Sequence, residues 1–219
     1  MLLDIKNISK SFKINNKNNF ILKNLSFAVD NNQIVSIYGA SGSGKSTLLN
    51  IISGLLSYDS GEIIFNSNIM DKNFNFSNFR KNDLGIIFQE DHLLLEFNVI
   101  ENIMLPSIIS GNNKNNAYKL AYDLLERFNL LSIKDSYSST LSGGEKQRVS
   151  ILRSIVNKPK LIIADEPTGS IDEANKEQIF NLFNDIIKDY DSSIIIATHD
   201  NNVSKISNKI LNLSNGKIE

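Results

Sequence analysis

Short apolar runs alternate with helical patterns along most of the chain. Residues 20–29 alternate between apolar and polar positions, which predicts a strand, and residues 45–56 carry an apolar stripe at helical spacing. The runs at 160–167 and 192–200 each hold four consecutive apolar residues, which is typical of parallel strands buried on both faces. The same patterns predict further strands at 33–39, 61–66 and 84–89, a helix at about 172–189 and a terminal hairpin at 209–219.

The middle of the chain departs from this alternation. From about residue 98 to residue 156 the pattern is mostly helical. Strands that alternate with helices indicate an α/β protein with a mainly parallel core sheet, and the helical stretch is predicted to be an insertion into it. We expect one domain over residues 1–219, in which 1–89 and 159–219 form the core and 90–158 form a helical subdomain.

Composition narrows the class of function. Hydrophobic residues make up 41% of the 219 positions, which is enough for a sizeable core. A net charge of −1, without a long basic run, argues against a nucleic-acid partner, and the absence of cysteine excludes disulfides and thiol chemistry. No apolar run is long enough to span a bilayer, and Asp4 and Lys6 interrupt any signal peptide. We therefore expect a cytoplasmic protein, which can still dock onto a membrane protein.

Two segments of five Asn and Lys residues, at 15–19 and 112–116, are predicted to be loop tips.

The glycine-rich segment GASGSGKS, at residues 39–46, follows a predicted strand and precedes a predicted helix. It fits the P-loop pattern, in which glycines let backbone N–H groups surround a phosphate. The pattern predicts roles for its residues in order: Gly39, Ser41, Gly42 and Gly44 in the phosphate cradle, Lys45 on the β- and γ-phosphates, Ser46 on Mg²⁺ and Thr47 near the α-phosphate.

Polar residues stand where three other predicted strands end. Asp165 follows four apolar residues, as in a Walker B strand, and is expected to hold Mg²⁺ and its waters. Glu166 comes next and is expected to orient or deprotonate the water that attacks the γ-phosphate. His199 is expected to contact the γ-phosphate, and Gln89 to contact Mg²⁺ or its water. The alternatives are an acidic pair that faces solvent and a histidine with a purely structural role.

The segment LSGGEKQRV at residues 141–149 contains a second glycine-rich helix start. Ser142 stands at the N-cap position with Glu145 three residues later, as in a capping box. A helix N-terminus of this kind suits a phosphate group. The alternative is a well-capped helix that binds nothing. One domain thus carries two phosphate-binding motifs about a hundred residues apart.

The order of these motifs resembles that of the ATP-binding-cassette ATPases, over nearly the whole chain. The resemblance implies a P-loop NTPase fold with an antiparallel β subdomain, and ATP and Mg²⁺ as ligands. It implies a head-to-tail homodimer, in which Ser142, Gly143 and Gly144 of one chain contact ATP bound to the P-loop of the other. It also implies that Asp172 lies in a loop that crosses the dimer seam, with Ser170 as a mild departure, and that Phe12 stacks on adenine.

Within the family, residues 88–106 and the motif IADEPTGSID resemble the lipoprotein-releasing ATPases and the related MacB-like exporters. Leu95 and Asn98 depart from the usual Pro and Thr, although Asn98 can still cap a helix. This resemblance implies integral-membrane permease partners at the cytoplasmic face of the inner membrane. The apolar strip at residues 92–97 either contacts them or packs inside the domain. MacB-like or FtsE-like roles remain alternatives, and a soluble cassette acting on DNA or ribosomes is disfavoured.

Overall fold

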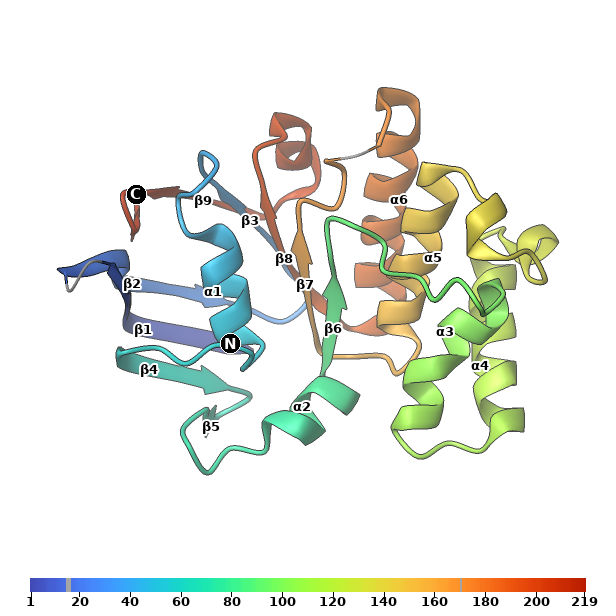
Figure 1. Cartoon of the computed structure of the whole chain (residues 1–219), viewed down its shortest axis with the longest axis horizontal. Coiled ribbons are helices and arrows are strands. Elements are labelled where there is room, and N and C mark those ends of the chain that lie inside the picture. The colour runs from blue at the N-terminus through green and yellow to red at the C-terminus, as the bar shows by residue number, and fades with distance from the viewer. Residues whose placement is uncertain (15–16, 170) are drawn as a thin grey trace.

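The computed structural model describes residues 1–14, 17–169 and 171–219, and it places a four-stranded sheet beside a six-stranded sheet. Ser170 and two residues of the first predicted loop tip, Asn15 and Asn16, lie outside the described residues. The smaller sheet is antiparallel, in the order β2-β1-β4-β5, and forms one side of the molecule (Figure 1). Its strands are β1 (Leu3–Ile14), β2 (Lys17–Val29), β4 (Ser60–Phe65) and β5 (Asn68–Ile69).

The larger sheet has the order β10-β9-β3-β8-β7-β6 and is parallel except for the terminal hairpin. Five neighbouring strands, β6, β7, β8, β3 and β9, run parallel, so their carboxyl ends lie at one edge of the sheet, the upper edge in Figure 1. Ligands of open α/β sheets bind at that edge. The strands are β3 (Ile34–Tyr38), β6 (Leu84–Ile87), β7 (Leu161–Asp165), β8 (Ser193–Thr198), β9 (Lys209–Ser214) and β10 (Lys217–Ile218).

Both faces of the parallel strands are buried, in two separate hydrophobic clusters. In β8, Ile195 and Ala197 face the cluster that contains α1 (Lys45–Ile52), which lies between the two sheets. Ile194 and Ile196 face the other cluster, which the remaining long helices cover. Successive side chains of a strand point to opposite faces, so wholly apolar strands are needed here. This explains the unbroken apolar runs in the sequence.

The helices of the second cluster come mostly from the predicted helical stretch. Three of them lie in the chain between β6 and β7 and pack on one side of the parallel sheet (Figure 1). No helix in the described ranges is both long and apolar enough to cross a bilayer. The helices are α2 (Phe76–Asn82), α3 (Val99–Ile109), α4 (Lys114–Arg127), α5 (Gly143–Ile155) and α6 (Glu173–Tyr190), with short 3-10 turns at Leu131–Ile133, Ser138–Thr140 and Asn201–Ile206.

The predicted boundaries differ from the structure in three places. The first predicted loop tip, at 15–19, is too long, because β2 already begins at Lys17 and pairs Asn18 and Asn19 with β1. The first helix was expected to reach residue 56 but ends at Ile52, because Gly54 adopts a left-handed conformation with φ +69°. The second predicted loop tip is also too long: Asn113 accepts a hydrogen bond from the backbone of Asn116, and α4 begins at Lys114. Asparagine is a good N-cap residue, so an Asn-rich segment can start a helix as well as form a loop.

Candidate functional site

The P-loop connects the end of β3 to the start of α1. Lys45, the first residue of α1, folds back so that its Nζ donates hydrogen bonds to the carbonyl oxygens of Gly39 (2.7 Å) and Ala40 (3.3 Å). Gly44 has φ +105°, and a Cβ there would approach the side chain of Ile21 to 3.0 Å. The loop therefore requires glycine at this turn. The lysine ammonium is thereby held over the mouth of the loop.

Gly39 is needed for a different reason, the close approach of the terminal hairpin. A Cβ on Gly39 would lie 2.6 Å from the carbonyl oxygen of Leu213 in β9 and 2.4 Å from Ser43 Oγ. Real Cβ atoms do not approach backbone oxygens this closely, so a larger residue would displace β9 or the loop. The β9 strand also pairs with β3, which leads into the loop. The hairpin thus fixes the position of the P-loop from one side.

Asp165 is the last residue of β7 and Glu166 follows it, next to β8 at the carboxyl edge of the sheet. Asp165 pairs with Ala197 in the ladder, and its Oδ1 is buried with no hydrogen-bond partner among the described residues. No group of three or more His, Asp or Glu among those residues could hold a metal alone. Mg²⁺ is typically held by one or two protein oxygens together with substrate phosphates. A buried, unpartnered carboxylate oxygen beside a P-loop fits that donor set.

Glu166 is the centre of a polar cluster. Thr198 Oγ1 donates a hydrogen bond to Glu166 Oε2 (3.0 Å), and the backbone N–H of His199 donates to the same oxygen (3.2 Å). His199 Nδ1 and Lys45 Nζ lie 2.9 Å and 3.5 Å from Glu166 Oε1. Burial favours a raised pKa for Glu166, but the hydrogen bonds from His199 and Thr198 outweigh burial and hold its pKa below the usual value. The carboxylate is therefore charged at neutral pH.

A cavity of about 600 Å³ brings the predicted nucleotide residues together. The sequence analysis did not predict two residues of this site. Ile21, an apolar residue of β2, lines the cavity, and Thr198 donates a hydrogen bond to Glu166. Twelve residues line the cavity: Phe12, Ile21, Ser41, Gly42, Gly44, Lys45, Ser46, Thr47, Gln89, Asp165, Glu166 and His199.

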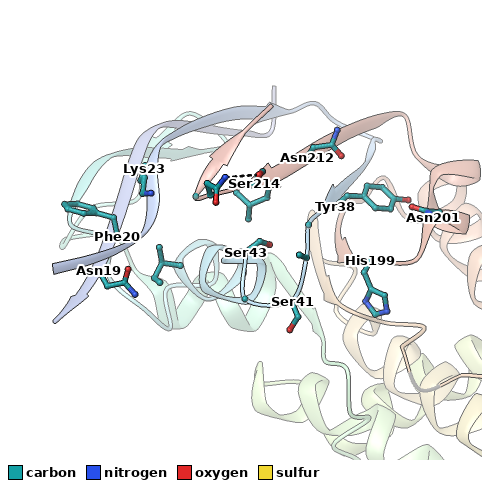
Figure 2. A pocket seen from close by; sticks show the side chains of 17 residues that line it. Asn19, Phe20, Lys23, Tyr38, Ser41, Ser43, His199, Asn201, Asn212 and Ser214 are labelled. Carbon is teal, nitrogen blue, oxygen red and sulfur yellow. Dashed lines mark hydrogen bonds between the residues drawn. The ribbon is translucent and has the colours of Figure 1, made fainter. Parts of the chain in front are cut away.

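A second, larger cavity of about 750 Å³ lies on the other side of the P-loop (Figure 2). Gly39 lines this cavity and not the first one. The polar side chains that line this second cavity come from β2, the P-loop, the terminal hairpin and the ends of β3 and β8, and Figure 2 shows Lys23 of β2 on the same side as Ser214 of the hairpin. It contains His199 but neither Asp165 nor Glu166. Because the carboxylates of a phosphoryl-transfer site are missing there, the 600 Å³ cavity is the candidate site.

The ring of Phe12 is 41% exposed at the mouth of the candidate site. The Lys10 ammonium lies 5.3 Å from the ring centroid, in the range of a cation–π contact, and is paired with Asp59 at 3.3 Å. The position is compatible with a stacked base. Its role in binding adenine stays a prediction.

The second glycine-rich motif forms the predicted helix start. Ser142 caps α5, and its hydroxyl and backbone N–H donate to Glu145 Oε2 at 2.7 Å and 2.9 Å. These hydrogen bonds keep the pKa of Glu145 below its usual value. Gly144 is buried against Asn175 of α6, which in turn bonds to Asp172 at the α6 N-cap. None of Ser142, Gly143, Gly144 and Asp172 lines either cavity beside the P-loop. Their predicted contact with a second chain therefore stays a prediction.

The apolar strip at residues 92–97 divides into two parts. Leu93 is only 7% exposed and belongs to the hydrophobic cluster under the helices, whereas Leu94 and Leu95 are 39% and 64% exposed. Asn98 caps α3 with Glu101 in a capping box, as predicted. Packing inside the domain is thus confirmed for Leu93, whereas contact of Leu94 and Leu95 with a membrane partner stays a prediction.

Known proteins share this arrangement over the full length of the chain. Residues 22–169 match a family model described as "ABC transporter". The lipoprotein-releasing system ATP-binding protein LolD of Buchnera aphidicola is 44% identical, covering 97% of this chain and 94% of that protein. The putative hemin import ATP-binding protein HrtA of Staphylococcus haemolyticus is 37% identical, with full coverage of both.

A solved structure, a dimeric post-hydrolysis state of the ATP-binding cassette MJ0796 bound to ADP and Pi, superposes with a TM-score of 0.88. The identity is 31%, and the match covers 100% of this chain and 97% of that one. The fold was thus predicted correctly from the motifs, including the antiparallel β subdomain. With its motifs gathered around one cavity and these likenesses over its full length, the chain belongs to the ABC transporter family of ATP-binding cassettes.

Proposed function

We propose that this chain is the ATP-hydrolysing subunit of a membrane complex that releases lipoproteins from an inner membrane, at its cytoplasmic face. The observation that carries the ATPase part is the meeting of Lys45, Asp165 and Glu166 in one cavity. The cargo rests on relatives named as lipoprotein-releasing, which are 37–44% identical across nearly the full chain. Among helices of the described ranges none could span the bilayer, so membrane partners would supply the spans.

The residues of the cavity divide the chemistry among them. Lys45 neutralises the β- and γ-phosphates, while Ser46 and Asp165 hold Mg²⁺ with Gln89 beside them. Mg²⁺, when bound, supplies positive charge against the phosphate oxygens. Glu166 accepts a proton from the attacking water, and His199 contacts the γ-phosphate. A bound γ-phosphate competes with Glu166 for the Lys45 ammonium, which now lies 3.5 Å from that carboxylate.

A second copy of the chain completes each site in this proposal. The N-terminus of α5 carries partial positive charge, and Ser142 and Gly143 are exposed there. Packed head to tail, each chain offers this helix start to the γ-phosphate held by the other. Asn175 packs on Gly144 at the start of α5 and donates a hydrogen bond to Asp172, so Asp172 lies near the same dimer interface. Loss of the γ-phosphate removes the shared ligand and opens the dimer.

Gly143→Ala is expected to weaken the dimer contact without lowering the stability of the fold. A Cβ on Gly143 meets no described atom within 4 Å, and Ala in a helix is up to about 1 kcal/mol better than Gly. We expect the melting temperature to stay level or rise, while ATP-dependent dimerisation weakens, because the added methyl keeps a partner's phosphate from the helix start. Sedimentation with ATP in a Glu166→Gln background measures the dimer.

Gly144→Ala is less informative, because Gly144 belongs to the same predicted contact and a Cβ there would also lie 3.0 Å from the side chain of Asn175. Undiminished dimerisation of Gly143→Ala would count against the head-to-tail site.

The membrane partner is expected to contact the exposed Leu94 and Leu95. In this proposal, residues 90–158 act as a helical subdomain and the rest of the chain acts as a catalytic core, because α3, α4 and α5 all lie between β6 and β7. Force from the partner on this loop would then move α5, and with it the second glycine-rich motif, relative to the P-loop.

Co-purification tests the biological assignment. The tagged chain is expressed in its own host, membranes are extracted with mild detergent, and the bound proteins are identified. Integral-membrane subunits with large periplasmic domains that bind lipoproteins are expected. Subunits that bind hemin would favour the second candidate function, which the HrtA likeness supports. Ribosomes or DNA-repair proteins without a membrane partner would refute a transport role.

A further inference from the structure

The loop of residues 91–97, between β6 and α3, is fastened to the helices by two polar side chains, the partly buried Arg153 and the fully buried Asn102. The Arg153 guanidinium, in the last turn of α5, donates to the carbonyl oxygens of His92 and Asp91, both at 2.7 Å. Hydrogen bonds from a charged donor are stronger than neutral ones. His92 also adopts a left-handed conformation, with φ +46°, which a non-glycine residue keeps only when its surroundings hold it there.

Asn102 fastens the second half of the same loop. It is fully buried on α3, and its Oδ1 accepts from the backbone N–H of Leu94 at 2.8 Å. Its Nδ2 lies 3.1 Å from the carbonyl oxygens of Leu94 and Phe97. A side chain must both accept and donate to do this, which an amide can and a carboxylate cannot. The exposed Leu95 is thus bracketed by two fixed backbone positions.

The hydrogen bonds of this loop go to the helices. Within the described residues, no hydrogen bond of residues 91–97 reaches the P-loop or the six-stranded sheet. Leu93 adds apolar contact, because it is buried in the cluster that the helices form with one face of the parallel sheet. Gln89, by contrast, follows β6 and lines the nucleotide cavity. The hydrogen-bonded attachment to the helices therefore begins at Asp91, two residues after Gln89.

We propose that Arg153 and Asn102 are positioning residues that make loop 91–97 one rigid body with α5, so that force on Leu94 and Leu95 reaches the second glycine-rich motif, at the other end of that helix. This inference rests on the proposed function for the source of the force. The α5 helix has 13 residues and is about 20 Å long, so it acts as a rigid rod between the loop anchor at Arg153 and the motif at Ser142. Neither positioning residue lines the nucleotide cavity.

Distances between labels test the anchor directly, and the chain has no native cysteine to interfere. Nitroxides are placed on Leu95→Cys and Tyr118→Cys, both exposed positions, the second on α4. Double electron–electron resonance, with excess unlabelled chain, then reports the distance within one molecule. We expect a narrow distribution in the parent and a clearly broader one in Arg153→Ala. Arg153→Lys, which keeps a donor, should narrow it again.

Arg127→Ala is the matched control, because Arg127 also stands in the last turn of a helix but pairs with Asp189, away from the loop. It should leave the distribution unchanged. An Arg153→Ala distribution as narrow as the parent's would overturn the anchor.

The second readout is ATP hydrolysis with and without the membrane partner. In Arg153→Ala we expect basal hydrolysis to persist, and partner stimulation to fall by about 2- to 30-fold, the range of residues that carry coupling. Equal stimulation of Arg153→Ala and the parent would overturn the transmission role. A parent chain that no membrane partner stimulates would instead refute the proposed function, and the label distances would still decide the anchor.

Discussion

Glu166→Gln is expected to lower the turnover number for ATP by about 10²- to 10⁴-fold, the usual contribution of a general base. The amide keeps the size of the side chain and can still contact Thr198 and His199, which lie within 3.2 Å of the carboxylate. It cannot take a proton from water. ATP binding should persist, because Lys45 and the P-loop backbone remain. Phosphate release at saturating ATP measures turnover, and equilibrium binding of a fluorescent ATP analogue measures affinity.

The same substitution should hold the dimer closed, since the shared γ-phosphate is not removed. Sedimentation with ATP is expected to show a stable dimer in Glu166→Gln and a transient one in the parent. Glu177→Gln, an exposed change of the same kind on α6, is the control and should behave as the parent does. Hydrolysis at the parent rate would show that Glu166 is not the catalytic carboxylate.

Lys45→Ala is expected to weaken ATP binding by about 10- to 150-fold. Hydrogen bonds to charged groups contribute about 1.5–3 kcal/mol, and each 1.4 kcal/mol is tenfold in the dissociation constant. The ammonium is buried and already directed toward the loop by the carbonyl oxygen of Gly39 at 2.7 Å, so little ordering is needed when phosphate binds. Titration calorimetry with ATP measures the loss.

Lys23→Ala removes the same charge from the neighbouring cavity of Figure 2, also beside the P-loop. It should leave ATP affinity unchanged. A strong loss of affinity in Lys23→Ala with none in Lys45→Ala would move the nucleotide to that cavity. Thermal melting of both variants separates lost binding from lost folding.

Motif spacing predicted most of the candidate site because the fold brings strand ends together by a general rule. Asp165 ends β7, Glu166 follows it, and His199 follows the adjacent parallel strand β8, so the sheet alone brings the three residues together. The capping boxes at Asn98 and Ser142 were also predictable, since they depend on residues three positions apart.

Contacts between distant segments were not predictable. Ile21 reaches the cavity from a different sheet, and Arg153 binds carbonyl groups about sixty residues earlier in the chain. A carbonyl group is present at every residue, so sequence carries no signal for which one is used. The division of the apolar strip into a buried Leu93 and an exposed Leu95 likewise depends on how Asn102 holds the loop.

The P-loop is supported by strands that are synthesised much later than the loop itself. β3, which leads into the loop, has β8 and β9 as its two neighbours, and the Leu213 carbonyl oxygen abuts Gly39. Both neighbours are made more than 150 residues after β3, by the residue numbers of these strands. A nascent chain therefore displays the phosphate-binding sequence long before it can support it. During synthesis the loop therefore gains the two strands that flank β3 only after β8 and β9 have been made.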